Sequence, residues 1–204
     1  MTSETISKGL WSVSAVLLVA ACSVQAENTE ALPGPAELQT QIPRPSISLP
    51  FDNPFPDRTN QSNDGSVFEP CIAYDDSELI RFDIDPKLIE DVAIVNGQGI
   101  RGCKWVMPER FSLSVAVTNS NSLEEYRSGA IEYNWMTDLE LGERTVGYFE
   151  LDHGFSKACL TYVQSANAGV VTKVVTYEDD NGPVGGACEL VANFTRAYID
   201  KIPE

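Results

Sequence analysis

The chain has 204 residues and a formal net charge of −16, with 30 acidic side chains against 14 basic ones. This balance argues against a function that needs a basic surface, such as binding nucleic acid or adhering to anionic lipid head groups. There is one histidine and no Cys-x-x-Cys pair, which speaks against a zinc site. We therefore expect no nucleic-acid partner, no metal and no cofactor.

The N-terminus carries the pattern of an export signal. The apolar stretch Gly9–Ala21 would span roughly 20 Å as a helix, less than the ~30 Å hydrocarbon core of a membrane. It ends in Val19-Ala20-Ala21-Cys22, which resembles the lipobox of bacterial lipoproteins. We predict that residues 1–21 are a lipoprotein signal peptide and that acylated Cys22 anchors the protein to the extracytoplasmic face of the cell membrane. The alternative is an ordinary secretory signal cleaved after Ala26.

The next segment is rich in proline, with seven prolines among the 44 residues 23–66. Proline removes a backbone donor and fixes φ, so neither a helix nor a strand can propagate here. We predict that residues 22–66 are the acylated cysteine and a disordered tether, and that residues 67–204 form one domain. Leu49–Phe51 and Pro54–Pro56 are apolar exceptions that could dock on the domain or on a partner.

The first half of the domain predicts short helices followed by strands. Asp75 precedes a short apolar–polar run, and Asp85 before Pro86 is typical of a helix N-cap. Residues 102–106 have the composition of a strand. Residues 111–117 alternate strictly between apolar and polar side chains, as a half-buried strand does.

The second half predicts one short helix, further strands and a final helix. Asn121 or Ser122 is expected to cap the short helix, and strand patterns recur at Glu143–Leu151, Ala158–Val163 and Val170–Tyr177. Val184–Ile202 places apolar residues at helical spacing. The order predicts an α+β fold: a mainly antiparallel β-sheet flanked by short N-terminal helices and a longer C-terminal helix.

Four cysteines remain once Cys22 is assigned to lipid. They are Cys71, Cys103, Cys159 and Cys188. An even number in an exported domain indicates two disulfides, and three pairings are possible. We favour Cys71–Cys103 and Cys159–Cys188, because each bridge then closes a single supersecondary unit.

Four motifs of the domain follow one another in a recognisable order. They are Phe68–Cys71 before a short helix, the Gly102–Trp105 strand, the alternating strand leading into Ser122–Tyr126, and the Cys188-bearing helix that ends near Pro203. Together they resemble the DUF3558 lipoproteins of actinobacteria over essentially the whole domain. The family pattern has four cysteines at matching places. The resemblance implies a cell-envelope lipoprotein from an actinobacterium, and it implies no established biochemical activity.

The sequence contains no convincing catalytic constellation. His153 lies between Asp152 and Gly154, which is typical of a hairpin tip, and there is no Gly-x-Ser-x-Gly turn. The acidic run 178–180 offers oxygen ligands, but it lacks EF-hand spacing, so we interpret it as a turn before the final helix.

The aromatic residues allow two interpretations. Trp105, Trp135, Tyr126 and Tyr133 either line a ligand groove or belong to the core. We expect a non-catalytic binding or scaffolding module whose partner is an unknown envelope protein. The alternative is a carrier of a small apolar or lipidic ligand in a cavity between the sheet and the C-terminal helix. An enzyme is the weakest of the three hypotheses, because no acid–base pair is apparent.

Overall fold

The central strands pair into one antiparallel sheet in the computed structural model, which describes residues 47–52, 55–93, 98–152, 157–177 and 182–204. Within this part of the chain, seven of the eight strands follow the order β1-β2-β3-β8-β7-β6-β4, and the remaining strand, β5, pairs with β6. Their bounds are β1 Ile89–Asp91, β2 Arg101–Met107, β3 Phe111–Asn119, β4 Asn134–Trp135, β5 Leu139–Leu141, β6 Arg144–Asp152, β7 Lys157–Ser165 and β8 Ala168–Thr176. Every pairing is antiparallel, which confirms the predicted fold class.

The strictly alternating segment lies near the middle of the sheet as strand β3. Phe111, Leu113 and Val115 are completely buried, whereas Ser112 and Ser114 between them are half-buried. β3 pairs with β2 on one side and with β8 on the other, so its apolar side chains enter the core at its centre. The alternating pattern in the sequence therefore predicts both the strand and the face that it buries.

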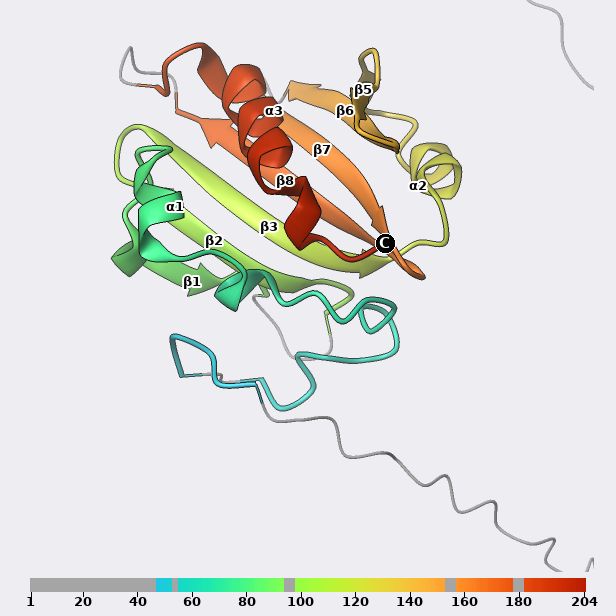
Figure 1. The fold of residues 1–204 in the computed structure, drawn as a ribbon, viewed down its shortest axis with the longest axis horizontal. Helices are drawn as coiled ribbons and strands as arrows, with labels where there is room; N and C mark the ends of the chain where they lie inside the picture. Colours follow the sequence, from blue (N-terminus) through green and yellow to red (C-terminus); the bar gives the residue numbers. More distant parts are fainter. Residues whose placement is uncertain (1–46, 53–54, 94–97, 153–156, 178–181) are drawn as a thin grey trace, which may run out of the picture. The chain divides into compact units, whose positions relative to one another are not determined.

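Helix α3 (Gly186–Tyr198) lies across the face of the sheet formed by β7 and β8, as Figure 1 shows. The apolar side chains that it adds to the main core recur at helical spacing: Ala187, Leu190, Val191, Phe194 and Tyr198. The 3-10 turn η3 (Ile199–Lys201) continues it. Among the described residues, no helix has the length and apolar character needed to cross a membrane.

Short helical elements precede the sheet, as predicted. They are η1 Pro70–Ile72, α1 Asp76–Ile80 and η2 Pro86–Leu88. Asp75 forms a reciprocal capping box with Glu78 at the start of α1, and the Asp85 carboxylate accepts the Lys87 N–H at 3.0 Å. The Tyr198 hydroxyl donates to the Glu78 carbonyl at 2.8 Å, which joins α1 to the end of α3.

Both favoured disulfides are present. Cys71–Cys103 joins η1 to β2, and Cys159–Cys188 joins β7 to α3. The paired cysteines are 32 and 29 positions apart, so chain entropy gives each bridge about 3.5–4 kcal/mol of stabilisation. Each bridge ties a helical element to the central sheet.

The segment before Val67 contributes to the domain, which corrects the predicted boundary. The compact unit runs from Ser46 to Glu204, and Leu49 and Phe51 pack against the core. Arg58 and Asn63 are only 5% and 0% exposed. Prolines prevent helix and strand in this segment, but they do not prevent burial where side chains satisfy the backbone. Thus the Asn63 amide donates to the Arg58 carbonyl at 2.9 Å.

Candidate functional site

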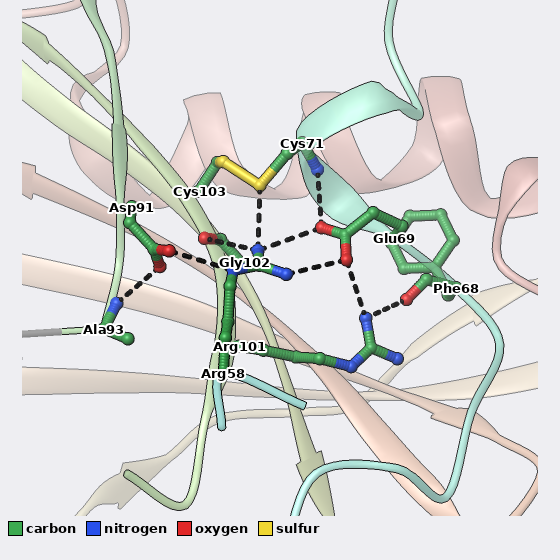
Figure 2. The surroundings of a disulfide bond; sticks show 9 residues. All are labelled: Arg58, Phe68, Glu69, Cys71, Asp91, Ala93, Arg101, Gly102 and Cys103. Carbon is green, nitrogen blue, oxygen red and sulfur yellow. Dashed lines mark hydrogen bonds and ion pairs between the residues drawn. A yellow bond between two sulfur atoms is a disulfide. The ribbon is translucent and has the colours of Figure 1, made fainter. Parts of the chain in front are cut away.

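A buried ion network holds the N-terminal segment beside the Cys71–Cys103 disulfide (Figure 2). Arg58 donates to both Glu69 carboxylate oxygens, at 2.8 and 3.0 Å, and to Asp91 at 2.9 Å. Its Nη2 also lies 3.1 Å from Cys71 Sγ. Burial disfavours the charge, but the hydrogen bond and charge of Glu69, followed by those of Asp91, hold the pKa of Arg58 above its ordinary value.

Arg101 completes this network from strand β2. Its guanidinium donates to three backbone carbonyls, those of Asn63 at 2.9 Å, Phe68 at 2.6 Å and Ser66 at 2.5 Å. It also lies 3.3 Å from Glu69. Two guanidinium groups and two carboxylates thus neutralise one another inside the protein. This network fixes the irregular N-terminal segment, and its polar atoms are committed to that structural task.

The four aromatic residues of the predicted groove do not lie together. Trp105 is 1% exposed and belongs to the main core, where its ring meets Tyr74 edge-on at 6.2 Å. Tyr126, Tyr133 and Trp135 instead join a second apolar cluster around Phe149. Trp105 is therefore removed from the candidate groove.

The second cluster lies on the face of the sheet that points away from α3. Thr161 contacts Thr195 of α3 at 2.6 Å, so its neighbours Leu160 and Tyr162 project to the opposite face. Helix α2 (Leu123–Gly129) covers them, and its Ser122 cap accepts the Glu125 N–H at 3.0 Å, as predicted. Gly147 allows this close packing, because a Cβ there would collide with the Leu123 side chain.

The rings of this cluster are held in fixed geometry. Tyr133 stacks on Phe149 with centroids 5.1 Å apart, and Tyr126 stacks on Tyr162 at 4.6 Å. The Arg127 guanidinium lies 4.5 Å from the Trp135 ring centre and pairs with Asp138 at 2.6 Å. These contacts order the surface that α2 and the following turn present.

A surface hollow of about 450 Å³ opens beside α2, with Tyr126 and Tyr133 among its lining residues. Its polar groups include Ser120 and Glu125. The Tyr162 hydroxyl donates to Gln164 at 2.7 Å, so the Ser120 hydroxyl 2.6 Å away is the donor to Tyr162. Burial raises the pKa of Tyr126, which keeps this phenol protonated. The hollow offers rings and hydrogen-bonding groups.

Several predicted site residues fall outside the described residues. These are Cys22, His153 and the acidic run 178–180. Glu150 does lie within 4.8 Å of the Cys159 and Cys188 sulfurs, a combination that could hold a metal if the thiols were free. The two sulfurs form a disulfide, so neither is a thiolate ligand.

The fold and its bridges define a disulfide-linked α+β domain with a surface hollow on the face away from α3. A family model described as a protein of unknown function, DUF3558, matches residues 17–201. The chain therefore belongs to the DUF3558 family, as its motifs indicated. A comparison with curated proteins gives no significant match.

Proposed function

We propose that this protein is a lipid-anchored cell-envelope lipoprotein whose domain is a non-catalytic binding or scaffolding module. Two disulfides support an oxidising, extracytoplasmic compartment. The family match starts at residue 17, so the shared sequence includes Val19–Cys22. The proposed acylation site therefore lies within the matched region.

The binding role rests on one observation, the aromatic-walled hollow beside α2. Its two tyrosine rings are held by stacking, and Ile131, which directly follows the lining residue Ala130, is 85% exposed. Ordered tyrosines beside an exposed apolar side chain are typical of contact sites for proteins. We infer that an envelope protein binds at this surface.

The ionisable groups favour binding over catalysis. Catalysis by acid–base chemistry needs a perturbed acid or base that faces a cleft. The buried charges of Arg58, Glu69, Asp91 and Arg101 are instead paired with one another. In the hollow, the Glu125 carboxylate accepts the Asn121 N–H at 2.8 Å. These groups therefore serve structure in the described part of the chain.

The carrier hypothesis has less support. It needs space between the sheet and the C-terminal helix for an apolar ligand. Val191, Phe194 and Tyr198 project from α3 into that interface and are 0%, 1% and 6% exposed. Their side chains occupy the region in which such a ligand would lie.

The surface beside α2 can be tested by site-specific photo-cross-linking in the host cell. A cross-linking amino acid at position 131 should trap one dominant envelope protein. Position 184 is the matched control, because Val184 is 91% exposed but lies just before α3. Ile131→Ser should weaken binding of the trapped partner by about tenfold, or ~1.4 kcal/mol, and Val184→Ser should not. The same cross-links from both positions would contradict the proposed surface.

The lipid anchor is tested separately. Cys22→Ser should move the protein out of the membrane fraction into a soluble or unprocessed pool, because serine lacks the thiol that would accept the diacylglyceryl group. Membrane fractionation and intact-mass measurement report the change. A variant with the same detergent partitioning and no loss of lipid mass would show that Cys22 is not the anchor.

A further inference from the structure

A second hollow, of about 360 Å³, lies between the end of α1 and helix α3. It is lined by Arg81, Phe82, Asn193, Arg196 and Ala197. Arg81 is the C-cap of α1, and Arg196 stands in the last turn of α3. Two arginines from elements far apart in the sequence therefore line one depression.

These two arginines differ from the others in the described part of the chain. Four arginines there pair with carboxylates, namely Arg58, Arg101, Arg110 and Arg127. A fifth, Arg144, donates to the carbonyls of Ile199 and Ile202. Arg81 and Arg196 are exposed, and among the described residues neither has a carboxylate within 4.0 Å. Unlike Arg144, whose guanidinium donates to backbone carbonyls, these two arginines of the described chain leave their guanidinium groups exposed without a carboxylate beside them.

The neighbouring side chains arrange these donors. Arg196 Nη1 donates to Asn193 Oδ1 at 2.7 Å, which uses the amide oxygen and leaves the amide N–H₂ as a donor. Arg81 lies 6.0 Å from the centre of the Phe82 ring, and that ring is packed edge-on against Phe194 at 5.2 Å. The hollow thus presents N–H donors around an apolar patch.

A site of this kind selects an oxyanion. Guanidinium groups carry only donors, and their planar fork matches phosphate oxygens in pairs. Two of them balance the charge of about −1.5 to −2 on a phosphate monoester. We propose that Arg81 and Arg196 form an anion-binding site that takes a phosphate group, with Asn193 as an additional donor. This site goes beyond the proposed protein-binding surface and does not depend on it.

The phosphate group has two possible sources, a soluble phosphate ester or a phospholipid head group. Both are tested on the exported chain by nuclear magnetic resonance of the arginine Nε–H groups and by calorimetry. The probes are inorganic phosphate, dihexanoylphosphatidylglycerol below its micelle concentration and, as the zwitterionic control, dihexanoylphosphatidylcholine. A response to inorganic phosphate assigns the site to soluble phosphates. A response to the anionic lipid alone assigns it to head groups.

The matched variants distinguish binding at this site from nonspecific attraction of an anion to a positive side chain. The double variant Arg81→Gln with Arg196→Gln should weaken binding of the responding probe at least tenfold, because it removes both guanidinium groups. Arg110→Gln removes the same kind of charge from a half-buried arginine already paired with Asp83, and it should change the affinity less than twofold. Unchanged thermal unfolding of the double variant shows that it is folded.

Two results would overturn the proposal. One is the absence of any shift of the Arg81 and Arg196 signals with either anionic probe up to about 10 mM, a concentration that would nearly saturate a 1 mM site. The other is an equal loss of affinity in the Arg110→Gln variant. Either result would leave the two arginines with only their local role at the C-terminal ends of α1 and α3.

Discussion

A chain that begins at Val67 should fail to fold, whereas one that begins at Ser46 should fold fully. The shorter chain lacks Arg58, so the carboxylates of Glu69 and Asp91 lose their shared buried partner. It also lacks the Asn63 carbonyl that accepts from Arg101. Near-ultraviolet circular dichroism and thermal unfolding of both chains measure the difference. A cooperative transition of the shorter chain at the same midpoint would contradict the structural role of the segment.

The point variant Arg58→Met tests the network without truncation. Removing one partner of a buried ion pair costs about 3–5 kcal/mol, which for a domain of this size lowers the unfolding midpoint by about 10–15 °C. Arg110→Met is the matched control, because the Arg110–Asp83 pair is 3.8 Å apart and open to solvent on the Asp83 side. Exposed pairs contribute about 0–1 kcal/mol, so this control should shift the midpoint by no more than about 4 °C. Equal shifts would mean that the Arg58 network contributes no more than a surface pair.

Local patterns in the sequence predict local elements of this fold well. The alternation of residues 111–117 gives β3 and its buried face, because a strand repeats every two residues. Ser122, Asp75 and Asp85 occupy the N-caps of helical elements, because their side chains satisfy N–H groups that the helix leaves unpaired. The spacing of the cysteines also favours the correct pairing.

The parts that the sequence does not predict depend on contacts between distant positions. Arg58 reaches the Gly102 carbonyl 44 positions away, and no periodic pattern links them. A proline-rich composition is typical of a tether, and it conceals Arg58, which helps to make the segment part of the domain. Glu69 next to Pro70 and Cys71 is the one local signal, because a carboxylate beside a buried cysteine needs a cationic partner.

The residues of the candidate site are likewise only partly predictable from the sequence. Trp105 and Trp135 are equivalent as residue types, yet one lies in the main core and the other in the cluster on the opposite face. Trp105 lies two positions from both Cys103 and Met107 in β2, so the three side chains project to the same face. This alternation can be read from the sequence. Which face of the sheet α3 covers depends instead on tertiary packing. Alternation therefore assigns residues to faces, and packing assigns those faces to the core or to the surface.

Removing Cys71–Cys103 should destabilise the domain more than removing Cys159–Cys188, although the two bridges span nearly equal lengths of chain. The separations of 32 and 29 positions give about 3.5–4 kcal/mol of chain entropy in each case. The surroundings of the two bridges differ. Cys71 Sγ accepts from Arg58 Nη2 at 3.1 Å inside the ion network, whereas Cys188 is half-buried at the surface of α3.

The two bridges can be compared by urea unfolding of two double variants, Cys71→Ala with Cys103→Ala and Cys159→Ala with Cys188→Ala. The chain entropy that each variant restores to the unfolded state is nearly the same. We expect the first pair to lose about 1–2 kcal/mol more than the second, because it also removes an acceptor for a buried guanidinium. In an Arg58→Met background that extra loss should disappear, since the donor is then absent. Equal losses in the wild-type background would show that the sulfur contact adds nothing to the bridge. An extra loss that persists without Arg58 would place its origin in the packing of Cys71, which is buried, whereas Cys188 of the other bridge is half-buried.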